Sequence, residues 1–404
     1  MKQPKVAFVL SKFPCDDELF LLREIHGIAK HADVWIFSLR RAGDAIVHDE
    51  AHDLLPQTFY VPYLLSTRLW LANLRMLLGR PRRTLSALRR LVRGNWRSLE
   101  FLLKNMIFFP KAVYLADWAL RRGAEHLHGC WATYPASVAL AAAEIAGLPF
   151  SFSGHAHDIY VDTTDLAEKI SRAAFVTTCT ASNGEYLRRL APDCPAARIT
   201  VVRHGIEVSH FAPGERSVSP IDVLSVGSLV PRKGFEYLIE ALAVLDEEGV
   251  DFRATIVGGG RLERALGEQI RRRGLDAKVT MTGALRHSAV MPHFARASIF
   301  VLMCQPESHF GLPNVIIEAL ASRVAVVTPR FGSVEELVED EKTGLLVPPR
   351  DPRALASALS RLAEDSELRQ RMAAAGYEAV ARAFELNASV AEYVSRFRGS
   401  AVRE

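Results

Sequence analysis

The stretch from Glu307 to Val338, ESHFGLPNVIIEALASRVAVVTPRFGSVEELV, combines a glycine turn, a short helix and one glutamate set among apolar residues. Gly311 allows backbone to approach a ligand closely, and Pro313 suits the first turn of a helix. The free amides at such a helix start attract an anion, and a diphosphate would fit there. We therefore predict a nucleotide-phosphate site at this turn.

Glu318 lies about one and a half turns into this predicted helix, between Ile317 and Ala319. A buried carboxylate without a partner costs on the order of several kcal/mol, so a buried Glu318 needs a partner such as ribose hydroxyls. The alternative is an amphipathic helix with Glu318 on its exposed face. The burial of this one side chain distinguishes the two interpretations.

Two further turns with anion-binding chemistry follow predicted strands. In LSVGSLVPRKGFEYLIEAL, a strand ends at Gly227, and Arg232 and Lys233 precede a helix that begins at Gly234. Charge-assisted hydrogen bonds from these cations suit a diphosphate, whereas a solvated surface loop is the alternative. In TIVGGGR, Gly259 is the middle residue of a turn that either admits a base or phosphate at close range or is only a tight turn.

A fourth candidate, SGHAHDIYV, follows a strand and contains His155, His157 and Asp158. An imidazole at such a position can hydrogen-bond a sugar hydroxyl or help position a leaving group, which is the interpretation we favour. One alternative is a pair of hydrogen-bonded core histidines. Another is a hydrolytic metal site, which needs further ligands, and the candidates for these are His128, His204 and Asp162.

Short β-branched runs alternate with helical patterns along most of the chain. The strand candidates are KVAFVLS, DVWIFSLR, PFSFSGH, FVTTCT and ITVVRHG in the first half, and IDVLSVGSL, FRATIVG, KVTMTG, ASIFVLM, VAVVTPR and TGLLVPP in the second. This alternation predicts an α/β protein with two doubly wound parallel sheets. Ligands bind beyond the carboxyl ends of strands in such sheets, which is where the candidate turns lie.

The length of 404 residues suits two domains. Pro, Gly and Ser cluster in FAPGERSVSP, which we interpret as a linker at 211–220. We expect an N-terminal domain over 1–210 with a basic helical insertion at 64–122, and a C-terminal domain over 221–385. We expect the segment 386–404 to be a helix that returns to the N-terminal domain.

The cysteines are scattered and odd in number, without C-x-x-C spacing: Cys15, Cys130, Cys179, Cys194 and Cys304. This usage argues against a disulfide framework and a zinc site, and predicts a reduced, cytoplasmic protein. The apolar run from Val6 to Leu10 is too short for a signal peptide, and no uninterrupted apolar run reaches the length that spans a membrane.

Arginines are concentrated in one part of the chain, although the net charge is only +4. From Leu54 to Leu99 there is no acidic residue, and arginines interleave with Leu, Trp and Met at Arg68, Arg75, Arg80, Arg82, Arg83, Arg89, Arg90, Arg93 and Arg97. This pattern predicts basic amphipathic helices that contact an anionic membrane surface, with a solvated basic face as the alternative. No recognition motif accompanies the charge, which argues against nucleic-acid binding.

Several of these motifs occur together in one known family. VPRKGFEYLIEAL, IVGGGRL, VTMTGAL, FGLPNVIIEAL and GSVEELVEDEKTGLLVPPRDP, with FPCDDELFLLREI and SGHAHDIYV upstream, resemble glycosyltransferase family 4 over nearly the full length. The chain is most similar to bacterial exopolysaccharide and capsule glycosyltransferases. The resemblance implies a GT-B fold of two Rossmann-like domains facing a central cleft, a nucleotide-sugar donor, retention of configuration, and no metal or other cofactor.

The resemblance also assigns roles to residues. Glu318 matches the ribose-binding glutamate, Lys233 the diphosphate-binding lysine and His155 the histidine near the donor sugar, and these are the predicted catalytic residues. The expected donor site comprises Gly227, Arg232, Lys233, Gly259, Glu307, Phe310, Gly311, Leu312, Pro313, Asn314 and Glu318. The residues expected on the acceptor side are Glu18, His157 and Asp158.

Two positions depart from the family pattern. The family's first glutamate, eight residues before the second, falls on Phe310, and the arginine usual after the strand glycine falls on Ser228. One lost charge-assisted bond costs roughly 1.5 to 3 kcal/mol, or one to two decades of affinity. Arg232 and Lys233 would partly offset this loss, and Glu307 is a candidate replacement for the missing glutamate.

We therefore predict a retaining transferase that moves a hexose from a UDP- or GDP-sugar to a lipid-linked or saccharide acceptor in bacterial surface polysaccharide synthesis, at the inner face of the cell membrane. The alternative is a catalytically weak or inactive nucleotide-sugar-binding subunit of a membrane biosynthetic complex. A sugar-nucleotide epimerase or hydrolase would differ from both, because its product forms without an acceptor.

Overall fold

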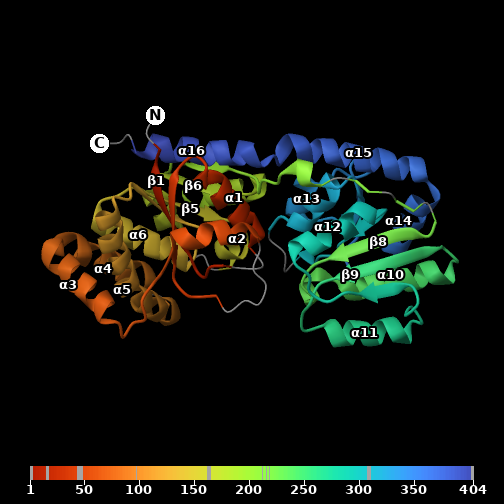
Figure 1. The fold of residues 1–404 in the computed structure, drawn as a ribbon, viewed down its shortest axis with the longest axis horizontal. Helices are drawn as coiled ribbons and strands as arrows, with labels where there is room; N and C mark the ends of the chain where they lie inside the picture. Colours follow the sequence, from red (N-terminus) through yellow and green to blue (C-terminus); the bar gives the residue numbers. More distant parts are fainter. Residues whose placement is uncertain are drawn as a thin grey trace. The chain divides into compact units, whose positions relative to one another are not determined.

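The computed structural model describes residues 3–14, 18–42, 49–96, 98–161, 165–211, 213–214, 216–217, 219–306 and 311–401. The chain divides into two compact units (Figure 1). Unit 1 comprises Met1–Gly205 with Leu386–Glu404, and unit 2 comprises Ile206–Glu385. The division thus falls at Gly205, ahead of the segment 211–220 that we interpreted as a linker.

Each unit is built on one parallel sheet. The seven strands of unit 1 are β1 (Lys5–Leu10), β2 (Asp33–Ser38), β3 (Thr58–Tyr60), β4 (His126–Gly129), β5 (Phe150–Gly154), β6 (Phe175–Thr178) and β7 (Ile199–Val201). The six strands of unit 2 are β8 (Ile221–Val226), β9 (Phe252–Val257), β10 (Val279–Met281), β11 (Ile299–Val301), β12 (Ala325–Pro329) and β13 (Leu345–Val347). The predicted α/β class with two doubly wound sheets is confirmed.

The strand order places a topological switch point in the middle of each sheet. Unit 1 has the order β3-β2-β1-β4-β5-β6-β7, and unit 2 has the order β10-β9-β8-β11-β12-β13. Both orders begin with the Rossmann pattern, in which the chain builds outward from its first strand and then continues on the other side of it. The ligand crevices expected from this topology lie at the carboxyl ends of β1 and β4 and of β8 and β11.

Helices surround both sheets, which explains why the strands are apolar runs without alternation. In β1, Ala7 and Val9 belong to the core on one face of the sheet, whereas Val6, Phe8 and Leu10 belong to the core on the other. The helices of unit 1 are α1 (Leu19–Ala29), α2 (Asp49–Leu54), α3 (Thr67–Gly79), α4 (Pro81–Asn95), α5 (Leu99–Arg122), α6 (Tyr134–Ala146), α7 (His157–Tyr160), α8 (Leu166–Arg172), α9 (Ala181–Leu190) and α16 (Leu386–Ala401). Those of unit 2 are α10 (Phe235–Glu247), α11 (Glu263–Arg272), α12 (His287–Arg296), α13 (Asn314–Ala321), α14 (Pro352–Glu364) and α15 (Ser366–Ala383).

Short 3₁₀ helices complete the connections: η1 (Leu55–Gln57), η2 (Ala196–Arg198), η3 (Val208–His210), η4 (Pro231–Lys233) and η6 (Gly332–Glu336). Two helix ends illustrate capping by residues suited to it. Asp351 accepts a hydrogen bond from the amide of Ala354 at the start of α14, where Pro352 occupies the first helical position. Gly147 ends α6 in the left-handed conformation, with φ of 76°.

The C-terminal helix α16 is part of unit 1 and lies beside α1 (Figure 1). It also packs against β4. A Cβ atom on Gly205 would lie 2.6 Å from the Cα atom of Leu386, so the chain leaves unit 1 next to the point where it re-enters it. On the unit 2 side, the amide of Ile206 donates to the carbonyl of Phe384 at 2.8 Å. Among the described residues, no helix combines the length and the apolarity needed to cross a membrane.

Candidate functional site

The turn after β8 carries the cations predicted to bind a diphosphate. Gly227 follows the strand, and a Cβ atom there would lie 3.8 Å from Cδ and Cε of Lys233, so the lysine stem covers the strand end. Gly234 has φ of +66°, and a Cβ atom there would lie 2.0 Å from the carbonyl oxygen of Met303. Only glycine fits this position, because the turn packs directly on the chain that leaves β11.

A backbone hydrogen bond joins the two strand ends of this switch point. The amide of Gln305 donates to the carbonyl of Arg232 at 2.8 Å. Arg232 is exposed. Lys233 is half-buried as a residue, and its amino group is the part that protein atoms surround. Burial lowers the pKa of Lys233, and the neighbouring Arg232 charge adds to that effect. Two cations thus share one turn at the carboxyl ends of β8 and β11, where an anion would relieve their repulsion.

The three glycines after β9 are explained by packing between turns. A Cβ atom on Gly258 would lie 1.9 Å from the carbonyl oxygen of Gly227, and one on Gly260 would lie 2.7 Å from that of Leu229. The amide of Leu229 donates to the carbonyl of Gly259 at 2.9 Å. The tight-turn interpretation therefore accounts for this motif, and a contact of Gly259 with the donor stays a prediction.

The predicted phosphate turn precedes α13, which begins at Asn314 with Pro313 immediately before it. Leu312 and Pro313 are buried, and the hydroxyl of Ser333 donates to the carbonyl of Gly311 at 3.0 Å. The first backbone amides of α13 therefore lie next to this turn, and an anion site at a helix start needs such amides. Glu307 and Phe310 lie outside the described residues, and Ser228 is exposed on the turn after β8.

Glu318 is buried within α13, with 6% of its surface exposed. The exposed-face interpretation of this residue is therefore wrong. Its Oε1 atom lies 3.1 Å from Nε2 of His287, which is the first residue of α12. The protein itself thus supplies a partner to the carboxylate that we expected ribose hydroxyls to satisfy. His287 was not among the predicted site residues, because it lies 31 residues from Glu318 and no local pattern joins the two positions.

His155 lies beyond β5 and hydrogen-bonds through both of its ring nitrogens. Its Nε2–H donates to the carbonyl of Cys130 at 3.2 Å, and its Nδ1 accepts from Nε2 of His204 at 3.1 Å. Burial lowers the pKa of His155 to about 4, so the ring is neutral at pH 7. Phe20 stacks on His204 at a centroid distance of 4.0 Å and covers the pair.

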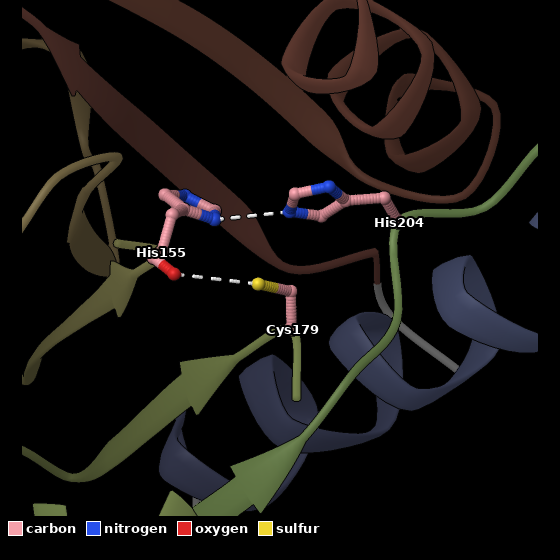
Figure 2. Close-up of side chains that lie close together, drawn as sticks. All are labelled: His155, Cys179 and His204. Carbon is pink, nitrogen blue, oxygen red and sulfur yellow. Dashed lines mark hydrogen bonds between the residues drawn. The ribbon is translucent and has the colours of Figure 1, made fainter. Parts of the chain in front are cut away.

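His155, Cys179 and His204 form a buried cluster whose nitrogen and sulfur atoms lie within 4.8 Å of one another (Figure 2). The Cys179 thiol donates to the carbonyl of His155 at 3.5 Å. Of the candidate metal ligands, His204 therefore lies with His155 in this cluster, whereas His157 is exposed. The ring of His128 is hydrogen-bonded to Ser151 and Ser153 instead. Asp162 lies outside the described residues. The cluster is an internal hydrogen-bonded group, as the core-histidine interpretation expects. A contact between His155 and the donor sugar stays a prediction.

Asp158 is buried and holds two strand-end turns together. Its Oδ1 accepts from the amides of His155 and Ala156, and its Oδ2 accepts from the amide of Ala132 at 2.8 Å. Burial raises the pKa of Asp158, although these amides act in the opposite direction. The carboxylate thus fixes the position of His155, and an acceptor contact is not needed to explain it.

The two other predicted acceptor-side residues lie on the surface of unit 1. His157 is exposed at the start of α7, and Glu18 is half-buried immediately before α1. Both follow the carboxyl ends of strands, β5 for His157 and β1 for Glu18. Their contact with an acceptor stays a prediction.

Residues 209–379 match the family model of glycosyl transferases group 1. The match covers most of unit 2 and none of the first 208 residues. The resemblance to a glycosyltransferase family that the motifs indicated is thereby confirmed, and the matched range contains the Arg232–Lys233 turn and Glu318. The cationic turn at the switch point therefore lies in the part of the chain that matches the glycosyl transferase model.

Curated relatives and a solved structure agree with this assignment. A putative colanic acid biosynthesis glycosyltransferase, WcaL of Escherichia coli, is 34% identical over 176 residues, which are 42% of this chain. The chain spans 43% of that relative's length. A GDP-mannose-dependent alpha-(1-6)-phosphatidylinositol monomannoside mannosyltransferase of Mycobacterium tuberculosis is 28% identical over 330 residues, covering 73% of this chain and 83% of the relative.

The Anabaena protein HepE, solved in complex with UDP, has the same fold with a TM-score of 0.71 and 18% identity over 97% of this chain and 99% of its own. The fold of the two Rossmann-like units is thus the GT-B fold.

Proposed function

We propose that the chain is a retaining glycosyltransferase that moves a hexose from a nucleotide diphosphate sugar to a saccharide or lipid-linked acceptor. The observation that carries this proposal is the Arg232–Lys233 turn at the carboxyl ends of β8 and β11, within a domain of the glycosyl transferases group 1. Two adjacent cations at a switch point suit the charge that develops on a leaving diphosphate.

The reaction breaks the bond between the anomeric carbon and the diphosphate oxygen, whose electron pair leaves with the nucleotide. The acceptor hydroxyl oxygen forms the new bond on the same face, and its proton passes to a leaving phosphate oxygen. Lys233, Arg232 and the first amides of α13 stabilise the leaving group. Neutral His155 positions the sugar, and Glu318 holds the ribose in exchange for, or together with, its bond to His287.

The donor class is proposed from the relatives. HepE was solved with UDP, and the mycobacterial relative is named for its use of GDP-mannose, so a uridine or guanosine diphosphate sugar is the proposed donor. The colanic acid relative supports an acceptor in surface polysaccharide synthesis. We place the acceptor on unit 1, near Glu18, His157 and Asp158, and the protein at the cytoplasmic face of the membrane.

The test is glycosyl transfer from UDP- and GDP-hexoses to lipid-linked and soluble saccharide acceptors, with a chelator present. We expect nucleotide release that requires an acceptor, and a product with the anomeric configuration of the donor. Lys233→Ala should lower turnover at least tenfold, whereas Lys342→Ala, which removes an exposed lysine of the same unit, should not. Product formation without any acceptor, or inversion, would contradict the proposal.

The second candidate function is a nucleotide-sugar-binding subunit with little or no activity, which the departures at Ser228 and Phe310 favour. It predicts nucleotide binding that depends on Lys233 but no transfer to any acceptor. The same assay therefore separates the two functions.

A further inference from the structure

Exposed large apolar side chains are concentrated in one stretch of unit 1. Of the fifteen such residues in the described part of the chain, fourteen lie between Tyr63 and Ile107, and the remaining one is Val161. They are Tyr63, Leu65, Trp70, Leu71, Leu74, Leu77, Leu78, Leu85, Val92, Trp96, Leu99, Leu103, Met106 and Ile107. Scattered exposed apolar residues are normal, but a concentration of this kind marks a binding surface.

Helix α3 is apolar on two opposite faces. Its inner face, formed by Leu69, Ala72 and Met76, is buried. Its outer face carries residues spaced at i, i+1, i+4, i+7 and i+8, which are exposed by 44 to 73%: Trp70, Leu71, Leu74, Leu77 and Leu78. A helix that is apolar on both faces is normally covered on both, because leaving apolar side chains in water is unfavourable.

The first turns of α5 repeat this arrangement beside α3. Leu99, Leu103, Met106 and Ile107 follow the same helical spacing and are exposed. The two helices pack side by side, because the side-chain amide of Asn73 donates to the carbonyl of Pro110 at 3.0 Å and Arg75 pairs with Asp117 at 2.8 Å. The outer apolar residues thus lie on neighbouring helices.

Helix α4 adds positive charge next to exposed apolar side chains. Arg82, Arg89 and Arg93 lie on the same side of the helix as the exposed Leu85 and Val92. Among the acidic residues that the structure describes, none forms an ion pair with these three arginines. Their charge is therefore available to an external anion.

We propose that α3, α4 and the first turns of α5 form a docking surface for an anionic lipid bilayer. The apolar side chains of α3 and α5 lie among the upper acyl chains, and the arginines of α4 contact lipid phosphates. This is the pattern of an interfacial helix, apolar on one side and basic beside it. α3, from Thr67 to Gly79, is too short to span a bilayer.

Charge distinguishes a bilayer from a second copy of the chain as the occupant. Pairing of two identical faces would bring Arg82, Arg89 and Arg93 of each copy together. The one acidic residue in the sequence of α3, α4 and the first turns of α5 is Glu100, which is already paired with Lys104 and so does not compensate these arginines. An anionic membrane surface supplies that compensation. The inference deepens the proposed function by bringing a lipid-linked acceptor to the protein, but the docking is measured without donor or acceptor, so its failure would leave the transferase proposal intact.

The experiment is flotation of the full-length protein with vesicles of phosphatidylcholine alone or mixed with phosphatidylglycerol. We expect recovery with the mixed vesicles only, and less recovery at high salt. Replacing Arg82, Arg89 and Arg93 by Gln should weaken partitioning about a hundredfold, since each basic group contributes about 1 kcal/mol. A matched control replaces three exposed arginines of unit 2, Arg253, Arg271 and Arg371, by Gln and should leave recovery unchanged.

The apolar part of the proposal has its own readout. The variant Leu71→Ser, Leu74→Ser, Leu78→Ser should lose recovery without loss of folding, because all three side chains are exposed. Trp70 should shift its fluorescence to the blue on mixed vesicles, a change that Trp70→Phe removes. Equal recovery with neutral vesicles, no recovery with either, an equal effect of the unit 2 control, or self-association that the leucine variant abolishes would each overturn the proposal.

Discussion

Replacing Glu24 by Gln should stabilise unit 1, by an amount that depends on pH. Glu24 lies on α1 with 3% of its surface exposed, and burial raises the pKa of its carboxyl to about 8. Its Oε1 has no hydrogen-bond partner among the described residues. Tyr393 of α16, whose hydroxyl lies 3.1 Å from both Ser153 and Thr177, acts against this shift. The carboxyl is therefore protonated in the folded protein at pH 7.

The magnitude follows from linkage. Between the ordinary glutamate pKa of 4.5, which applies to the unfolded chain, and the folded pKa of about 8, the folded state holds a proton that the unfolded state has lost. The free energy of unfolding therefore falls by about 1.4 kcal/mol per pH unit across this interval, and by about 5 kcal/mol in total. The contribution is fully present below pH 4.5 and lost above pH 8. Gln has the same shape and does not titrate, so it removes this dependence.

Urea unfolding followed by tryptophan fluorescence is the assay. All five tryptophans belong to unit 1, so the signal reports on that unit: Trp35, Trp70, Trp96, Trp118 and Trp131. The stability difference between Glu24→Gln and wild type should grow by about 4 kcal/mol from pH 5 to pH 8. Glu185→Gln, at an exposed position of α9, is the control and should show no such change. A constant difference for Glu24→Gln across this range would refute the reasoning.

Three further predictions concern the donor unit and the buried histidines. Gly234→Ala should destabilise unit 2 by at least about 2 kcal/mol in calorimetric melting, because its φ is +66° and the added Cβ meets the carbonyl oxygen of Met303; an unchanged melting temperature would contradict the described turn. His287→Ala should cost about 1 to 3 kcal/mol by leaving Glu318 without this partner, and adding Glu318→Gln should recover part of the loss in the same melting experiment. Burial lowers the pKa of His126 to about 3 and that of His155 to about 4, so the unfolded state binds protons first. The stability of the Glu24→Gln variant, which lacks the opposing titration of Glu24, should therefore fall as pH drops below 6.5; an unfolding midpoint of this variant that is constant from pH 6.5 to 4.5 would exclude this.

Local motifs predicted what depends on neighbouring residues in the chain. Gly227, Arg232, Lys233 and Gly234 follow one strand within eight residues, so their common turn was visible in the sequence. The alternation of strands and helices likewise predicted both sheets, because the period of each element is local.

Contacts between distant strand ends were not predictable in the same way. His155, Cys179 and His204 follow β5, β6 and β7, which are neighbours in the sheet of unit 1. Their clustering depends on strand order, and no local pattern encodes it. The same holds for the pairing of Glu318 with His287. The cost of burying a carboxylate predicted that Glu318 has a partner, but the sequence did not indicate which residue it is.

Calorimetric titration of UDP and GDP, with a chelator present, into wild type, Lys233→Ala and Lys342→Ala tests the central claim most directly. The claim is that the cationic turn at the carboxyl ends of β8 and β11 holds the diphosphate of the donor. It predicts that one nucleotide binds wild type and Lys342→Ala equally, and that Lys233→Ala weakens binding at least tenfold, since a charge-assisted bond contributes about 1.5 to 3 kcal/mol. Equal binding by Lys233→Ala, or no binding of either nucleotide to wild type, would contradict it.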